Sequence, residues 1–157
     1  MVDDEKATLL EFLDAQRGVV LAILDGLDEK LLRATAEPLG WTPLGMVEHL
    51  AYAERHWFQE VVLGSAPPLD WPDDDHTPLN TPRPPEVVFA FYAAQRRRAD
   101  EVIAATPLTA GSVGAHFGDT HDLRWIILHM VEETARHAGH LDVARQLLDG
   151  ATGLGPR

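Results

Sequence analysis

The nonapeptide EETARHAGH, residues 132–140, gathers two carboxylates and two imidazoles in one strongly helical segment. Glu133 and His137 are four residues apart. On an α-helix this spacing means about 40° of rotation and about 6 Å of rise, so both side chains leave the same face. One metal ion can bridge such a pair. Glu132 points about 100° away from Glu133, toward solvent.

Glu133 and His137 could form a metal site or an ordinary surface pair, depending on whether their face of the helix is buried. A surface pair would contribute roughly 0.3 kcal/mol to stability. The stripe that carries Glu133 and His137 also contains His129 and four apolar residues, namely Ile126, Met130, Leu141 and Ala144. This pattern predicts burial of the pair. Because an unpaired buried charge costs several kcal/mol, we expect a metal ion there if a further ligand exists.

A second amphipathic segment supplies that ligand. His49 lies beside Met46 and Leu50 on an apolar stripe. A lone histidine at such a position is usually an ordinary core residue. Together with Glu133 and His137, however, His49 completes a His, Glu, His set from two helices. Three protein ligands and one open position are typical of a catalytic zinc site.

Three other histidines are weaker candidates. His56 is seven residues after His49, or about 10.5 Å along a helix, which is too far for the same ligand set. We expect it to line the mouth of the site or to pack. His129 lies one turn before Glu133 and is a candidate partner of the ligands or substitute ligand. A role for His140 is left open.

Apolar periodicity predicts helices and no strands, so the class is all-α. Thr42 is suited to cap the second helix, with Pro43 in its first turn. The predicted helices cover about 4–27, 42–64, 85–106 and 121–150, with a short helical turn at 28–33.

These helices pack most simply as a four-helix bundle, in which side chains of facing helices build the sites. The chain of 157 residues suits a single domain over 1–157. Its second connection, GSAPPLDWPDDDHTPLNTPRPP, is long and rich in proline, which predicts an extended crossover. Such a crossover allows the second and third helices to run parallel.

Large aromatic residues divide between the core and this crossover. We expect Trp57, Phe58 and Trp125 in the core, and Trp71 in a pocket wall because loops carry function. The DDDH run at 73–76 is expected to be hydrated loop, with cation binding as the lesser alternative.

The arginines are expected mainly at the surface. The run at 96–98 predicts a solvated outer face of the third helix. The alternative for one of these side chains, or for Arg124 or Arg136, is to hold a substrate carboxylate.

Composition limits the partners and the compartment. Thirteen basic and 25 acidic residues give a net charge of −12, which disfavours nucleic acid and anionic membranes. The chain has no cysteine, so it offers no thiolate ligand or sulfur nucleophile. The start MVDDEK lacks the features of a signal peptide, and we expect a cytoplasmic protein. A homodimer is left open.

Two segments carry a resemblance. GWTPLGMVEHLAYAERHWF and LRWIILHMVEETARHAGHLDVARQLLDG resemble the signature helices of the DinB-like superfamily, specifically its actinobacterial DUF664 branch. The resemblance implies a four-helix bundle with a long second crossover. It also implies a divalent metal held by one histidine of the second helix and an H-x-x-x-H pair on the fourth.

In that pattern His49 and His137 match two ligand positions, and Glu133 stands where many members have the first histidine of the pair. The mycothiol-dependent maleylpyruvate isomerase of the same superfamily resembles this chain in having glutamate there. The metal that the resemblance favours is Zn. Ni, Fe and Mn are alternatives, because a carboxylate ligand tolerates several metals.

Other members transfer low-molecular-weight thiols such as mycothiol or bacillithiol. The resemblance therefore implies a metal-dependent thiol S-transferase acting on a small electrophile, with mycothiol as the co-substrate. A metal-dependent hydrolase and a non-catalytic metal- or ligand-binding stress protein are the alternatives. A di-iron bundle and a zincin protease are disfavoured, because the Glu-x-x-His and His-Glu-x-x-His patterns are absent.

Overall fold

The structure is a computed structural model that describes residues 2–72 and 79–153. Its helices are α1 Val2–Leu24, α2 Glu29–Leu32, α3 Pro43–Arg55, the π-helix η1 His56–Val61, α4 Pro85–Ala105 and α5 Leu123–Asp149. Over these residues there is no strand, and only isolated β-bridges occur in the α4–α5 loop. The all-α prediction is confirmed.

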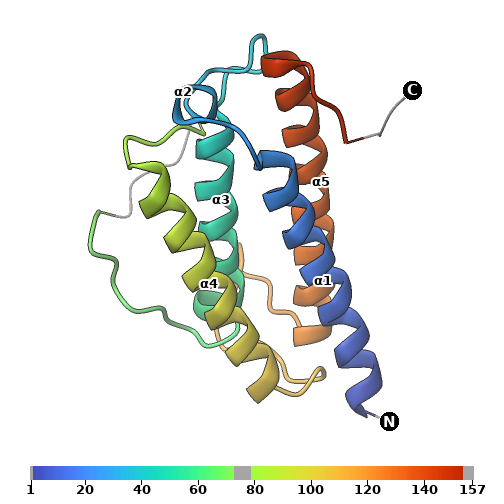
Figure 1. Cartoon of the computed structure of the whole chain (residues 1–157). Helices are drawn as coiled ribbons and strands as arrows, with labels where there is room; N and C mark the ends of the chain where they lie inside the picture. The colour runs from blue at the N-terminus through green and yellow to red at the C-terminus, as the bar shows by residue number, and fades with distance from the viewer. Residues whose placement is uncertain (1, 73–78, 154–157) are drawn as a thin grey trace.

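The long helices form a bundle (Figure 1). Helices α1 and α5 run in one direction and pack along each other, whereas α3 and α4 run in the opposite direction and pack together. The parallel course of α3 and α4 requires the crossover between them to return along the whole bundle, as its length predicted.

Short polar side chains set the helix starts. Thr42 Oγ1 accepts a hydrogen bond from the Gly45 amide at 3.0 Å, with Pro43 in the first turn, as predicted. Asp122 caps α5 by accepting from the Trp125 amide at 2.9 Å. These bonds satisfy amides that the helix itself leaves unpaired.

The second predicted helix changes character at its end. After Arg55 it continues as η1, a π-helix that reaches Val61. A π-helical turn accommodates more residues than an α-helical turn and is frequent at functional sites. Apolar periodicity carried no signal of this change.

The core has two apolar clusters along the bundle axis. The cluster toward the α2 end includes Val20, Leu50, Val88, Tyr92 and Leu141, and the other includes Leu13, Phe58, Ile103, Ile126 and Met130. Trp57 and Phe58 are buried, as predicted. The prediction for Trp125 was wrong, because this side chain is 42 % exposed and stacks on the loop residue His121.

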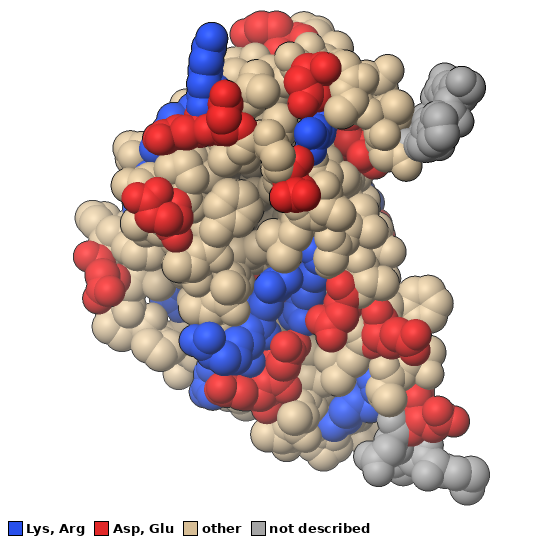
Figure 2. Space-filling model, viewed as in Figure 1, with Lys and Arg blue, Asp and Glu red and all other residues tan. Residues whose placement is uncertain are grey.

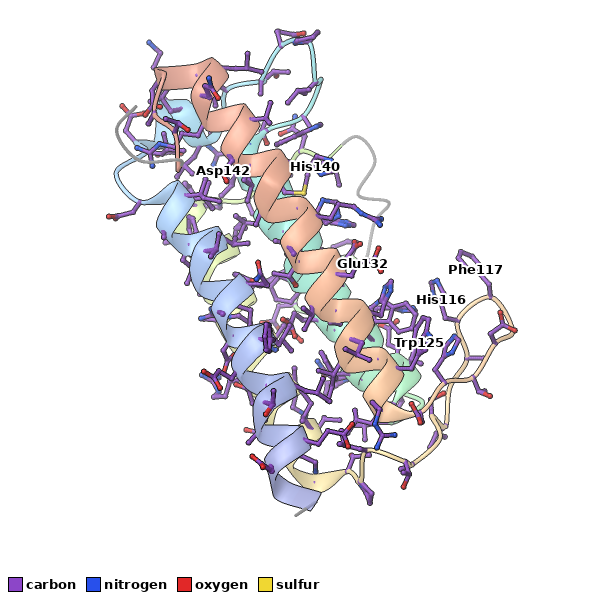
Figure 3. The ribbon with its side chains drawn as sticks, turned by 90° about the vertical axis from the view of Figure 1, so that its right-hand side faces the viewer. His116, Phe117, Trp125, Glu132, His140 and Asp142 are labelled. Carbon is purple, nitrogen blue, oxygen red and sulfur yellow. The ribbon has the colours of Figure 1, made fainter. Side chains whose placement is uncertain are left out.

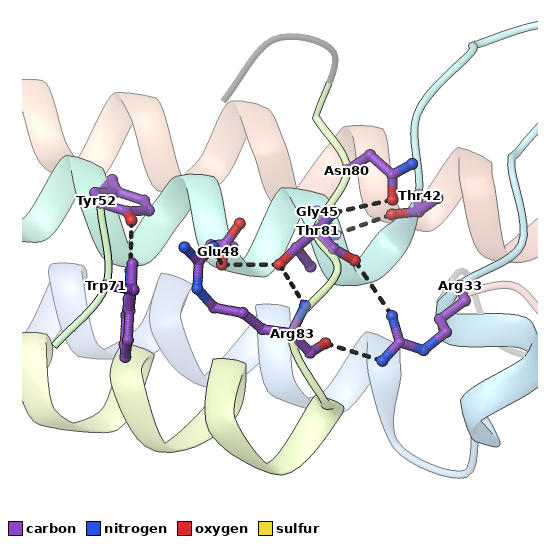
Figure 4. A network of polar contacts seen from close by, with 9 residues as sticks. All are labelled: Arg33, Thr42, Gly45, Glu48, Tyr52, Trp71, Asn80, Thr81 and Arg83. Atoms are coloured by element: carbon purple, nitrogen blue, oxygen red, sulfur yellow. Dashed lines mark hydrogen bonds and ion pairs between the residues drawn. The ribbon is translucent and has the colours of Figure 1, made fainter. Parts of the chain in front are cut away.

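The crossover is attached to α3 by a buried carboxylate, Glu48 (Figure 4). Glu48 Oε1 accepts hydrogen bonds from Thr81 Oγ1 at 2.9 Å and from Arg83 Nη1 at 2.7 Å. At Gly45 the crossover passes so close that a Cβ would lie 2.1 Å from the Leu79 carbonyl oxygen, so glycine is required there. The predicted loop at 73–76 lies outside the described residues.

A second buried carboxylate joins α3 to α1. The guanidinium of Arg17, 1 % exposed, donates to both oxygens of Glu54 at 2.7 Å. It also donates to Asp14 at 2.7 Å and to Asp100 at 2.8 Å. Figure 2 shows basic side chains gathered in the hollow between α1 and α4 with acidic ones beside them.

The net charge of −12 disfavours an anionic membrane as a partner. Among the described helices, none is both long enough and apolar enough to cross one.

Candidate metal centre and its cleft

The predicted ligands from α3 and α5 converge on one point. Glu133 Oε1 lies 2.9 Å from His137 Nε2 and 3.3 Å from His49 Nε2. One donor atom of each residue lies within 4.8 Å of the other two, and the three form a group suited to a metal ion. The two imidazole rings meet edge to face at 4.8 Å between centroids.

The donor chemistry of these atoms fits a divalent metal. Both Nε2 atoms are directed at the same carboxylate oxygen, which is an arrangement that a shared cation satisfies as well as two protons do. The imidazoles supply borderline nitrogen donors and the carboxylate supplies a hard oxygen, a combination that suits several divalent ions. All three residues are partly buried.

His140 supports one of the ligands from behind. Its Nδ1 lies 3.2 Å from Nδ1 of His137, whose Nε2 faces the carboxylate. When Nε2 of His137 holds a metal ion, its Nδ1–H can donate to Nδ1 of His140 and keep Nε2 directed at the site, which is how outer partners commonly orient metal-binding histidines. Burial lowers the pKa of His140, and the nearby His137 adds to this effect, so His140 is available as a neutral acceptor.

The carboxylate of the group is strongly held in its ionised form. The hydrogen bonds from His137 and from His49 lower the pKa of Glu133 far below its ordinary value, and they outweigh the opposing effect of burial. A permanently ionised oxygen is the form that binds a cation. Glu132, in contrast, is exposed and pairs with Arg136, as its predicted direction requires.

A cleft of about 420 Å³ opens beside this group. His49 and Glu133 are among its lining residues. Its other lining residues are aromatic or small and come from α3, η1, the α4–α5 loop and α5, namely Tyr52, Ala53, His56, Trp57, His116 and His129.

His56 and His129, the weaker ligand candidates, both line the cleft and neither belongs to the ligand group. His56 lines the cleft, as expected, and lies outside the ligand group. His129 also lines the cleft but contacts Trp57, with ring centroids 4.4 Å apart, so its role as a substitute ligand is not supported by the geometry. Burial lowers the pKa of His129, which keeps its ring neutral at neutral pH.

Trp71 lines a groove that is separate from the cleft beside the candidate metal centre. This groove runs along α4 and includes Phe91, whose ring lies 5.2 Å from that of Trp71. The indole Nε1 donates to the hydroxyl of Tyr52 at 2.9 Å. Trp71 therefore holds Tyr52, which lines the cleft beside the candidate metal centre, but Trp71 itself does not line that cleft.

The arginines stay away from the cleft. Arg98 pairs with Glu101 on the exposed face of α4, and Arg124 pairs with Glu5 at 2.6 Å. Arg96 packs over the ring of Tyr92, on the side where α4 meets α1. No arginine is among the cleft-lining residues of the described chain.

One cleft residue, His116, has no signal in the sequence pattern. It belongs to the α4–α5 loop, which carries neither a helical period nor a ligand-like spacing. The loop turns back on itself through the pairing of His116 with Asp119, whose main chains exchange hydrogen bonds at 2.9 Å. Figure 3 shows His116 on the side of this loop that faces α5, with Phe117 at its outer end.

Fold and site together define an all-α bundle protein with a three-residue candidate metal centre beside an aromatic cleft. A family model described as Mycothiol-S-transferase matches residues 8–150. The chain thus belongs to the mycothiol S-transferase family, consistent with the DinB-like resemblance. None of the curated proteins is significantly similar to the chain in sequence. Membership of the DUF664 branch stays a prediction.

Proposed function

We propose that the protein is a divalent-metal-dependent mycothiol S-transferase that acts on small electrophiles. The observation that carries this proposal is the convergence of His49, Glu133 and His137 beside a cleft, in a chain that matches the mycothiol S-transferase family over residues 8–150. The metal is proposed as Zn, with Ni, Fe and Mn as alternatives.

The residues have distinct roles in this proposal. His49, Glu133 and His137 would hold the ion, and His140 would keep the His137 ring in place. When bound, the metal supplies Lewis acidity that lowers the pKa of a coordinated thiol, so that a thiolate exists at neutral pH. The nucleophilic sulfur comes from the thiol substrate, since the chain has no cysteine.

The first experiment measures metal. Protein purified without chelator or metal-affinity resin should contain one divalent ion per chain by elemental analysis. His49→Ala and His137→Ala should each lose most of it, because two ligands rarely retain an ion that three hold. Full metal content in both variants would show that the site is misassigned.

The second experiment measures turnover. Holo and metal-stripped protein are compared with mycothiol, with another small thiol and without thiol, across a panel of electrophiles. We expect conjugation that requires both metal and mycothiol. Equal product without thiol would instead support hydrolysis, and no turnover in any arm would support a binding protein.

A further inference from the structure

The cleft contains a second set of titratable groups that metal binding does not use. His56 Nδ1 lies 2.8 Å from Glu60 Oε2, and His56 Nε2 lies 2.9 Å from His116 Nδ1. Glu60, His56 and His116 therefore form a hydrogen-bonded chain from a carboxylate to a histidine of the loop. Both imidazoles line the same cleft as His49 and Glu133.

The carboxylate fixes the proton positions along this chain. Because an ionised carboxylate only accepts, the hydrogen of a neutral His56 lies on Nδ1, and its Nε2 carries a lone pair. That lone pair accepts the Nδ1 hydrogen of His116. A neutral His116 is left with a basic Nε2, which has no hydrogen-bond partner among the residues that the structure describes.

The main chain holds His116 at this wall. The amide of Gly114 donates to the Val61 carbonyl at 2.8 Å, and the amide of Val113 donates to the Val62 carbonyl at 3.1 Å. A Cβ on Gly114 would lie 2.3 Å from the Glu60 carbonyl oxygen, so only glycine allows the loop to lie this close to η1. The loop and the helix that carries His56 are thus fixed relative to each other.

Aromatic rings form the walls around the hydrogen-bonded chain of Glu60, His56 and His116. The ring of His116 lies 4.5 Å from that of Trp57, and Tyr52 lines the same cleft. Aromatic faces of this kind suit a planar, conjugated ligand. Burial and the neighbouring imidazole of His56 lower the pKa of His116, so its resting form at neutral pH is the base.

We propose that His116, supported by His56 and Glu60, transfers protons during the addition of the thiol to an α,β-unsaturated carbonyl compound. This inference rests on the proposed thiol transferase function and names both its substrate class and a catalytic residue. Glu60 and His56 are positioning residues.

Protons and electrons balance in this reaction. Nε2 of His116 accepts the proton of the thiol, and the positive charge is stabilised through His56 by Glu60. The sulfur forms a bond to the β-carbon of the acceptor, and the π electrons of the C=C bond move toward the carbonyl to give an enolate. The enolate takes the proton back from His116, which returns to neutral. No oxidant, reductant or further reactant is needed.

Displacement of a halide provides the comparison reaction. Chloride leaves as an anion and needs no returning proton, whereas an enolate must be protonated. Benzylideneacetone and benzyl chloride are suitable electrophiles, because both are flat and of related size. The measured quantity is the ratio of their kcat/KM values with mycothiol in holo protein, after subtraction of the spontaneous reactions.

We expect this ratio to fall at least about tenfold in His116→Gln, in line with the size of general acid–base contributions. The matched control is His121→Gln. His121 belongs to the same loop but stacks on Trp125 at 3.6 Å between ring centroids and is not part of the cleft lining. Its ratio should equal that of the wild type.

Imidazole ¹⁵N NMR of the metal-free protein gives a second readout that requires no turnover. His56 and His116 should both carry their hydrogen on Nδ1, and Glu60→Ala should shift this preference at His56. A purely structural role of the loop predicts no such dependence on the carboxylate.

The outcomes separate the two proposals. An unchanged ratio in His116→Gln, or Nε2–H tautomers at both histidines, overturns the proton-transfer role. Wild-type protein that displaces chloride but does not add to the enone contradicts this inference and leaves the transferase function standing. Wild-type protein that conjugates neither electrophile contradicts both.

Discussion

Replacement of Arg17 by methionine should destabilise the bundle more than any exposed charge substitution. Burial alone would lower the pKa of Arg17, but the hydrogen bonds and charges of Glu54 and Asp100 outweigh it and raise the pKa, so the guanidinium stays charged. In Arg17→Met the carboxylate of Glu54, itself 1 % exposed, loses both of its 2.7 Å hydrogen bonds from Arg17. The variant keeps a buried charge without its hydrogen-bonded counter-ion.

The size of the effect follows from this uncompensated charge. Removal of one partner of a buried ion pair costs about 3–5 kcal/mol. For a chain of this length, each kcal/mol lowers Tm by roughly 2–4 °C, so Tm should fall by about 6–20 °C. Replacing both Arg17 and Glu54 by methionine should recover most of the loss, because the remaining Asp14 and Asp100 are largely exposed.

The loss should depend on pH. Burial raises the pKa of Glu54 above its ordinary value of 4.5, and the hydrogen bond and charge of Arg17 oppose this rise. Without Arg17 the pKa rises further, so the folded variant holds a proton that the unfolded chain releases above about pH 4.5. The folded state of Arg17→Met therefore loses stability as pH rises from 4.5 toward the raised pKa of Glu54.

Urea denaturation at pH 5 and pH 8 measures both effects. The control is Arg98→Met, whose partner Glu101 is 55 % exposed at its side chain, and it should change the free energy of unfolding by under about 0.5 kcal/mol. A loss below about 1 kcal/mol for Arg17→Met at pH 8, or equal losses at the two pH values, would refute the reasoning.

Three further outcomes are expected. Glu133→His should retain one metal ion per chain by elemental analysis, because imidazole replaces the carboxylate donor, whereas Glu133→Ala should lose it. Gly114→Ala should increase hydrogen exchange across residues 111–122, since its Cβ would lie 2.3 Å from a main-chain oxygen of η1; Gly18→Ala, with no atom within 4 Å, should not. Trp71→Phe should cost about 1 kcal/mol in urea denaturation, because it removes the 2.9 Å hydrogen bond to the tyrosine of α3.

The parts of the fold that sequence could predict are those with a local or periodic cause. The Thr42 cap and the proline after it fix the start of α3, and apolar stripes place His49, Glu133 and His137 on facing sides of two helices. Helical geometry then leaves little freedom in where these three side chains meet.

The other parts depend on contacts between distant segments. The α4–α5 loop is placed by main-chain hydrogen bonds to the end of η1, which no side-chain pattern encodes. His116 was missed for this reason. Trp125 was wrongly assigned to the core because an amphipathic pattern cannot tell a helix face covered by other helices from one that faces a loop. Arg17 was missed as well, because its partners lie 37 and 83 residues away along the chain.

The attachment of the α4–α5 loop separates what the loop must keep from what it is free to change. Its anchors at Val113 and Gly114 are amide hydrogens, which every residue except proline provides, and the strict demands are for glycine at 114, beside the Glu60 carbonyl oxygen, and at 118, where φ is +90°. Neighbouring positions can therefore accept new residues while the loop holds its place against the bundle. Phe117 at the tip is 96 % exposed, and its ring lies 4.3 Å from that of His116 between centroids. Under the proposed transferase function, changes in this loop alter the preferred electrophile without disturbing the packing that holds the candidate ligand histidines.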